Sequence, residues 1–412
     1  MRVQSIFLCG LFLLAGVSRV SAQLIPLGFD TLQHAHEITM DGGIDYYGSS
    51  VERDLLSKFI RGGMITEEIK DNSFDRHKAI NRFGAFYGGE IEYHNFNKHI
   101  FKKKNWGYVI KAGYQGFAGI LYSKDLFGLA MYGNERYLGT TIDISGSDIS
   151  AMTFQKVGFG LIDGRTKSSV VLNIYNVSSA VSGDFRTFKI VQDAEGDQIS
   201  LEMDAEVMMR NSAKFNQGLG VGLDLDFRLP VAWGKDRQAY IRFQAQNVGF
   251  AYMYEPQKFY SIDTTFTFSG LTFNQLIGDN SLISDSTFCI LDTLGFQSST
   301  RYKTYMLPGF LQIGKIVDEH YDGKLQSFFG LRLYPTLIYS PYIFAGMDYH
   351  PADWVRLGIN AGYGGFGKFR AGLYTDFRFG KYSVGVSSEN LLGFFWKKAS
   401  GQSLFFRLRC AF

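Results

Sequence analysis

The sequence contains few cysteines and prolines, and each scarcity excludes a class of protein. Only 3 Cys and 7 Pro occur among 412 residues. Cys9 lies in an apolar run near the N-terminus, Cys289 in a polar stretch, and Cys410 close to the C-terminus. We therefore do not expect a disulfide scaffold. Because no Pro-rich or Ser-rich linker divides the chain, we also expect a single domain.

Long apolar runs and a strong net charge are also missing. After residue 22, no apolar run approaches the ~20 residues that a membrane-spanning helix needs, which excludes a helical membrane protein. The formal net charge is +3, and without the first 22 residues 40 basic side chains stand against 39 acidic ones. This balance does not indicate a nucleic-acid partner. The chain is therefore either soluble or a membrane β-barrel.

The first 22 residues have the three parts of a secretory signal peptide. Arg2 supplies the positive start, residues 6–17 form the apolar run, and residues 20–22 (Val-Ser-Ala) form a cleavage site of small residues. The apolar run is too short to span a bilayer, and Cys9 lies within it, which argues against a lipoprotein. We expect cleavage after residue 22, so that the mature chain comprises residues 23–412.

The C-terminus alternates between apolar and charged side chains. Leu404, Phe406, Leu408, Cys410 and Phe412 form one apolar face, and the opposite face carries Arg407 and Arg409. A strand with lipid outside and a polar lumen inside has this pattern. The terminal aromatic resembles the insertion signal of bacterial outer-membrane barrels, which we assign to Phe406, Leu408 and Phe412. The last strand of a soluble sandwich stays open as an alternative on this segment alone.

Aromatic residues and glycines are abundant. The chain has 38 Phe, 24 Tyr and 47 Gly. Membrane barrels place aromatic rings in two girdles at the membrane surfaces, and glycine suits turns and crowded strands. The composition therefore favours a membrane barrel over a soluble β-protein.

Strand-length alternation recurs from about residue 82 to the end. In residues 219–228, apolar side chains alternate with Gly220, Gly222, Asp224, Asp226 and Arg228. Three successive inward charges would be costly in a soluble core, and runs of about ten residues match a tilted bilayer span. We predict an all-β fold: a closed antiparallel transmembrane β-barrel of roughly 14 strands in the outer membrane. Residues 184–209 form either a long hairpin or two more barrel strands.

Two regions depart from this alternation. Residues 49–70 have a helical apolar face of Val51, Leu55, Phe59 and Ile60. Ser50 is the expected N-cap and Gly62-Gly63 the expected stop, so we predict a short helical segment. Residues 270–300 are polar and poor in strand patterns, with a possible short helix at 271–277.

The predicted inward charges suggest how the lumen is filled. Early strands are mostly acidic and late strands mostly basic, and a closed barrel places its first and last strands side by side. We expect Glu90 and Glu92 to lie near Arg407 and Arg409, with ion pairs across this seam. The alternative is a water-filled pore with solvated charges. The proposed lumen charge network is Glu90, Glu92, Asp224, Asp226, Arg228, Arg370, Asp376, Arg378, Arg407 and Arg409.

Candidate chemical sites are weak. His34 and His36 with Glu37 offer a partial metal-ligand set, but no second cluster completes it, and we expect a solvated segment before the first strand. The glycines of residues 218–222 lie within a strand, so they do not form a nucleotide loop, and no nucleophile elbow occurs. We predict no metal, no cofactor and no enzymatic activity.

Several short segments resemble an uncharacterised family of Bacteroidota outer-membrane barrels. The matching segments are residues 122–127 (Tyr-Ser-Lys-Asp-Leu-Phe), 132–134 (Tyr-Gly-Asn), 261–270 (Ser-Ile-Asp-Thr-Thr-Phe-Thr-Phe-Ser-Gly) and 388–393 (Ser-Glu-Asn-Leu-Leu-Gly). More broadly, the chain resembles fatty-acid-transporter-type barrels, which are typically 14-stranded with an N-terminal hatch, and barrels that accompany the type IX secretion translocon. By this resemblance, residues 49–70 would be hatch-like. The motifs are too short to transfer any functional residue.

Three functional hypotheses remain. The first is a non-enzymatic accessory or structural subunit of an envelope secretion or transport assembly, with a mostly blocked lumen. Its expected partners are outer-membrane lipid, lipopolysaccharide and a large secretion translocon subunit. The second is a channel or carrier for small hydrophobic molecules, which needs a continuous apolar path. The third is an outer-membrane enzyme, which needs a polar triad on the wall. Fold alone does not separate them, and we favour the first.

Overall fold

The computed structural model describes residues 34–96, 100, 105–195, 198–209, 214–232, 238–268, 297–317 and 324–412. The predicted signal peptide, Cys289 and the possible helix at 271–277 lie outside these residues. None of the described helices combines the length and the apolarity needed to cross a bilayer.

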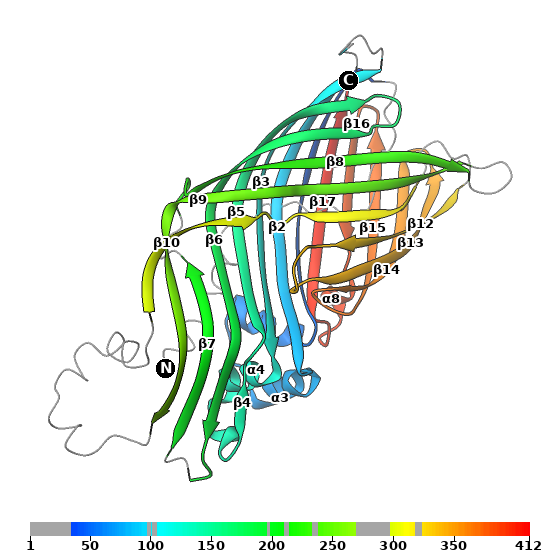
Figure 1. Cartoon of the computed structure of the whole chain (residues 1–412). Helices are drawn as coiled ribbons and strands as arrows, with labels where there is room; N and C mark the ends of the chain where they lie inside the picture. The colour runs from blue at the N-terminus through cyan, green and yellow to red at the C-terminus, as the bar shows by residue number, and fades with distance from the viewer. Residues whose placement is uncertain are drawn as a thin grey trace.

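Fourteen antiparallel strands form a closed barrel, which confirms the predicted fold class (Figure 1). The ring closes where β17 pairs with β1. In order around the ring, the strands are β1 (His36–Gly48), β2 (Ile80–Asn95), β3 (Trp106–Ser123), β5 (Ser147–Asp163), β6 (Ser169–Gln192), β8 (Gly218–Ala232), β9 (Gln238–Phe268), β11 (Phe310–Ile316), β12 (Leu325–Leu333), β13 (Ser340–Ala352), β14 (Val355–Gly365), β15 (Phe369–Phe379), β16 (Tyr382–Ser388) and β17 (Gly401–Ala411).

The first barrel strand lies in a segment that the sequence analysis treated as solvated. Residues 36–48 form β1, which pairs with both β2 and β17. Its outward face carries Ile38, Met40 and Ile44, and its inward face carries acidic side chains. The prediction was wrong because the Gly42-Gly43 pair and the nearby acids obscure this alternation.

The barrel has two different ends and two walls of different height. The N-terminus of β1 and the C-terminus of β17 lie at one end, which we call the terminal end; residues 353–354 and 380–381 form short turns there. The other end, the loop end, carries the longer connections 49–79 and 124–146. Strands β2 to β9 of the ring form a tall wall, and β11 to β17 form a low wall (Figure 1).

The tall wall continues past the loop end as a protruding sheet. Residues 182–192 of β6 pair with β7 (Ile199–Met209), and residues 258–268 of β9 pair with the other edge of β7. The far edge of β9 pairs with β10 (Gln297–Met306), and β4 (Thr141–Asp143) pairs with the end of β6. The stretch 184–209 is therefore a hairpin that extends the sheet, and it adds no strand to the barrel.

The predicted helix at 49–70 is in fact two helices, α2 (Arg53–Arg61) and α3 (Glu67–Arg76). Helix α2 ends at Gly62, as predicted, with a φ of 79° that glycine tolerates. Its N-cap is Glu52, without a side-chain hydrogen bond. Ser50 does not cap it, because its hydroxyl donates to Asn81 Oδ1 at 2.6 Å.

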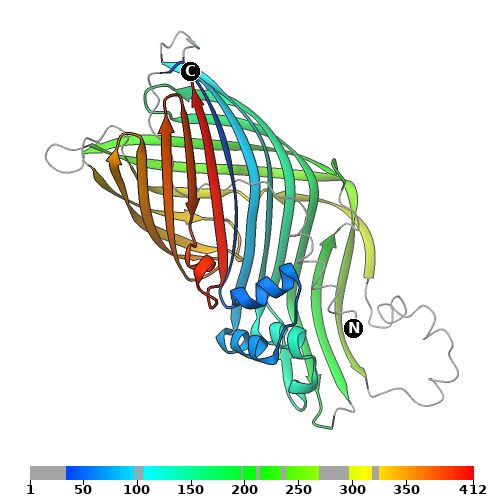
Figure 2. The ribbon, with the colours of Figure 1, turned by 180° about the vertical axis from the view of Figure 1, so that it is seen from behind.

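The helices cover the outside of the tall wall rather than its lumen (Figure 2). Leu55 and Leu56 of α2 pack with Tyr122 of β3, and Phe127 of α4 (Lys124–Tyr132) completes the cluster. Because Tyr122 faces outward, this position does not match a hatch within the lumen. A short helix, α8 (Leu392–Phe395), lies in the connection before β17.

The outer face of the barrel carries an apolar belt. Outward side chains such as Val157, Leu172 and Ile343 are more than half exposed. Tyr87 and Tyr114 face outward on β2 and β3, and Tyr93 and Tyr108 do so nearer the terminal end. An apolar surface of this extent is unfavourable in water, and it has the pattern of a lipid-facing barrel wall.

Candidate functional site

Inward side chains near the terminal end form an ion-pair cluster, which begins at the barrel seam. Arg407 of β17 donates to Asp41 of β1 at 2.5 Å, and Arg409 donates to Glu37 at 2.7 Å. From the sequence alone, Glu90 and Glu92 are the expected seam partners. The ion pairs of the two arginines are instead with acids of β1, because β1 lies between β17 and β2.

Two lysines occupy the centre of the ion-pair cluster. Lys156 Nζ of β5 lies 2.5 Å from Glu90 and 3.2 Å from Asp224. Lys111 Nζ of β3 lies 2.6 Å from Glu92 and 3.5 Å from Glu90. The Lys156 side chain is 0% exposed, whereas that of Lys111 is 12% exposed. Each buried charge is therefore balanced by neighbours of opposite sign.

A third group completes the ion-pair cluster on β8 and β9. Arg242 makes a bidentate pair with Asp226 at 2.8 and 2.6 Å, the geometry that gives charge-assisted hydrogen bonds their strength. Arg228 approaches the same carboxylate at 3.8 Å. On β2, His94 Nε2 lies 3.1 Å from Glu92 Oε2 and adds to the same cluster.

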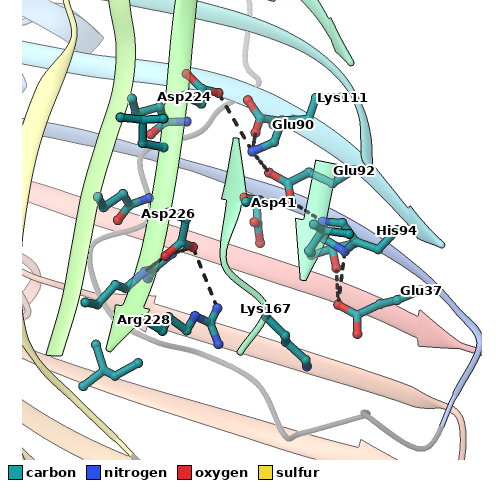
Figure 3. A pocket seen from close by; sticks show the side chains of 18 of the residues that line it. Glu37, Asp41, Glu90, Glu92, His94, Lys111, Lys167, Asp224, Asp226 and Arg228 are labelled. Carbon is teal, nitrogen blue, oxygen red and sulfur yellow. Dashed lines mark hydrogen bonds and ion pairs between the residues drawn. The ribbon is translucent and has the colours of Figure 1, made fainter. Parts of the chain in front are cut away.

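These groups surround a polar cavity of about 170 Å³. Figure 3 shows their side chains converging from several strands, with the acids and bases linked by ion pairs. A polar cavity of this size holds several waters. This half of the lumen is therefore ion-paired around a wet cavity.

The remaining predicted lumen charges lie apart from this cavity. Arg370 pairs with Asp45 at 2.8 Å and lies 3.5 Å from Glu389 of the β16–β17 connection. Asp376 is fully buried on the inward face of β15. Arg378 lies at the terminal end of β15, with its Nε 3.5 Å from the Gly380 carbonyl. The ten predicted residues thus belong to more than one group.

The loop-end half of the lumen contains an aromatic plug, formed by Phe86, Phe117, Tyr334, Tyr339 and Phe366. All five side chains are buried. Tyr334 and Tyr339 come from the β12–β13 connection and Phe366 from the β14–β15 connection, so two loops of the low wall fold inward. Their rings meet Phe86 of the tall wall, with centroids 4.8 Å from Tyr334 and 5.2 Å from Phe366. The rings therefore bridge the lumen from one wall to the other.

A glycine allows this close contact. A Cβ at Gly84 would lie 2.2 Å from the ring of Phe366, so only glycine lets the ring rest on β2. Next to the plug, the Arg370 guanidinium lies 4.6 Å from the ring centroid of Tyr47 and 5.1 Å from that of Tyr342. The plug is not predictable from the sequence because short loops carry no periodic signal. Lys156, which lies next to Phe154 on the inward face of β5, was also not predicted.

The predicted insertion signal lies on the outer face. Phe406, Leu408 and Phe412 are 38%, 44% and 45% exposed. At the same end of the β1–β17 pair, His36 Nδ1 lies 2.9 Å from the Tyr93 hydroxyl, and the His36 ring stacks on Phe412. Glu37 faces the lumen, so His36 and Glu37 diverge. Among the described residues, no group of three His, Cys, Asp or Glu side chains could hold a metal ion.

Comparisons with known proteins give only distant similarities. No protein-family model matches the chain, and neither does any curated protein. The structure of the toluene transporter TodX of P. putida has a TM-score of 0.37 and 9% identity, covering 92% of this chain and 89% of that chain. The translocator domain of the autotransporter NalP from Neisseria meningitidis has a TM-score of 0.29 and 8% identity, covering 92% and 88%. Similarities this low have no bearing on function.

Proposed function

We propose that this chain is a non-enzymatic outer-membrane β-barrel that serves as an accessory or structural subunit of an envelope secretion or transport assembly. The observation that carries the proposal is the filled lumen. The aromatic plug bridges the two walls at the loop end, and the ion-pair cluster occupies the terminal end. A passive pore needs a continuous water path, whereas buried aromatic rings from both walls meet across the lumen at the plug.

Placement in the outer membrane is supported by the outer surface. The fourteen ring strands close on one another, so the ring itself presents no unpaired edge. The apolar belt and the outward tyrosines match a lipid-facing wall. By the same reasoning, the long connections of the loop end would face the cell exterior, where lipopolysaccharide is the neighbouring lipid.

The protruding sheet supports a role in an assembly. Strand β10 pairs with β9 on one edge, and no strand among the described residues pairs with its other edge. An exposed strand edge is a template for pairing with a partner. Tyr302, on the outer face of β10, is well exposed, and tyrosine is enriched at binding hot spots. The family resemblance suggests a large translocon subunit, such as that of type IX secretion, as the partner.

The test is native electrophoresis of gently solubilised outer membranes, probed for this chain. We expect the chain to migrate in an assembly far larger than its own 46.4 kDa, in a fixed ratio to one large partner. Tyr302→Ser should shift it towards the mobility of the barrel alone. Tyr349→Ser is the matched control, because Tyr349 is also exposed but lies on the low wall. Migration of the unmodified chain as a lone barrel would contradict the proposal.

The second candidate is a carrier for small hydrophobic molecules of the fatty-acid-transporter type. It is favoured by the chemistry of the plug, because an obstruction of aromatic rings on two short loops suits the passage of an apolar molecule. Uptake of a small hydrocarbon into cells that contain the unmodified barrel would support this candidate. If uptake is absent in both the unmodified chain and Phe366→Ala, the first proposal is favoured.

A further inference from the structure

An apolar groove lies on the outer face of the tall wall, beneath the helices at the loop end. Its volume is about 280 Å³, close to the lower end of the ~300–1,000 Å³ range of small-molecule sites. Outward side chains such as Ala85, Ala118 and Ala151 line it on the wall, and Phe117 of the aromatic plug borders it from the lumen side. Nothing in the proposed function as a structural subunit requires it.

The floor of the groove is a row of small residues across neighbouring strands. Ala85 of β2 pairs with Ala118 of β3, which pairs with Ala151 of β5. The next row towards the loop end is bulky, with Phe83, Ile120 and Ile149 in register. Three alanines in register beside this bulky row therefore form a depression across the strands.

Two independent connections roof this floor. Val51, Leu55 and Phe59 come from α2, in the β1–β2 connection, and Phe127 and Met131 come from α4, in the β3–β5 connection. Both helices contribute side chains to the buried cluster around Tyr122, and the cavity lies between these helices and the wall. An empty apolar cavity is unfavourable, and water would find few hydrogen-bond partners there. The groove is therefore shaped for an apolar occupant.

The apolar belt lies on the same strands, on the terminal side of the groove. The floor strands carry Ile91, Ile110 and Val157 farther along the same outward face, and all three are well exposed. Between floor and belt lies a row of hydroxyls, in which Tyr87 and Thr153 are hydrogen-bonded at 3.0 Å. An apolar groove with a hydroxyl rim facing the belt suits a molecule with a hydrocarbon chain and a polar group.

We propose that this groove binds one acyl chain of an outer-leaflet membrane lipid, which turns outward from the belt past the hydroxyl row to enter the groove. The inference rests on the proposed outer-membrane placement. Lipid capture would fix α2 and α4 against the wall, so that the loop end is held in a defined position at the membrane surface.

The first experiment compares lipid retention by the full chain after gentle extraction and washing, using native mass spectrometry. Ala118→Leu with Ala151→Leu fills the floor and should cause at least about a tenfold loss of retained lipid. Ala112→Leu is the matched control, because Ala112 is an outward alanine of the same strand in register with Ile91 and Val157. Equal retention by all three proteins would overturn the proposal, as would a free fatty acid as the only retained molecule.

A second experiment needs no variant and covers the case in which the filled variant does not fold. The unmodified barrel is placed in vesicles that contain a phospholipid with a photoreactive acyl chain, and the labelled peptides are mapped. Labelling of both α2 and the floor is expected. Labelling confined to the belt around Ile110 would overturn the groove. Absence of the barrel from membranes would instead contradict the proposed function itself, so the two failures are distinguishable.

Discussion

The two halves of the barrel lumen are filled in different ways. Near the terminal end, acids and bases from many strands pair around a polar cavity of about 170 Å³. At the loop end, two short loops of the low wall bring Tyr334, Tyr339 and Phe366 against Phe86 of the tall wall. The first half has room for several waters, whereas the second is filled mainly by packed aromatic rings.

This difference assigns separate roles to the two halves. An ion-paired region sets the positions of its strands but does not seal a lumen, because water still solvates its cavity. Packed aromatic rings leave far less space for water, a cavity of about 20 Å³ beside Phe86, Phe117 and Tyr334. We therefore attribute closure of the lumen to the aromatic plug, and precise strand positioning at the seam to the ion-pair cluster. The following predictions test this division.

The largest effect is expected from Phe366→Ala in the aromatic plug. The Phe366 side chain is fully buried, and removing a buried Phe typically costs ~3–5 kcal/mol. The free energy of unfolding in detergent, measured by urea titration with band-shift electrophoresis, should fall by about this amount. Phe369→Ala is the control, because Phe369 is 55% exposed on the outer face. Similar losses for the two variants would show that the plug is not a packed core.

A comparable but smaller loss is expected from Lys156→Met in the ion-pair cluster. Methionine keeps the length of the side chain but leaves Glu90 and Asp224 with less compensation, and breaking a buried pair typically costs ~3–5 kcal/mol. Because water in the adjacent cavity relieves part of this cost, we expect the lower end of that range. The same titration should show a smaller loss for Lys111→Met, whose side chain is partly exposed. A stability unchanged by Lys156→Met would contradict a structural role for this half.

A pH-dependent effect is expected in the helical layer outside both halves. Burial lowers the pKa of His77, between α3 and β2, from 6.5 to about 4. Above pH 6.5 the ring is neutral in both states and its contribution to stability is complete. As the pH falls below 6.5, only the unfolded chain gains the proton, so stability should fall by ~1.4 kcal/mol per pH unit until about pH 4.

The measurement is the difference between the unmodified chain and His77→Gln over this range. In the neutral ring Nδ1 donates to Ser73 O at 2.6 Å and Nε2 accepts from the Tyr122 hydroxyl at 3.0 Å, and glutamine can partly replace these hydrogen bonds. The variant should lose the pH dependence of the unfolding free energy that we assign to His77, while the aromatic plug should stay packed. Parallel pH profiles for the two proteins would contradict the assignment.

The smallest effect is expected from the ion pairs of the protruding sheet. Arg186 of β6 pairs with Asp204 of β7 at 2.6 Å, but its side chain is 46% exposed. Exposed pairs contribute ~0–1 kcal/mol and are screened by salt. Arg186→Gln should therefore change the unfolding free energy by less than ~1 kcal/mol, and raising the salt concentration should remove the difference. A loss as large as that of Lys156→Met would erase the distinction between inner and outer ion pairs.

The barrel itself was predictable from the sequence because lipid and lumen impose strict alternation. Residues 219–228 and the C-terminal strand show this alternation clearly. Counting such runs from about residue 82 to the end predicted roughly 14 barrel strands. The inward charges at Asp224, Asp226 and Arg407 were identified in the same way. Strand β1 was missed, although Ile38, Met40 and Ile44 alternate with inward acids, because two glycines interrupt the pattern.

The aromatic plug could not have been found by such reasoning. Whether Tyr334 or Phe366 turns inward depends on the opposite wall, on the space left by Gly84 and on the height of the low wall. These are tertiary properties without a local signal. The pairing of Arg407 with Asp41, rather than with the predicted Glu90, likewise depends on which strand closes the ring.

The central claim is that the aromatic plug closes the lumen, and electrical recording across a planar lipid bilayer tests it most directly. The unmodified chain, inserted as the full barrel, should show no steady ion conductance, whereas Phe366→Ala combined with Tyr334→Ala should open measurable conductance. A stable open conductance of the unmodified chain, unchanged by these substitutions, would contradict the account.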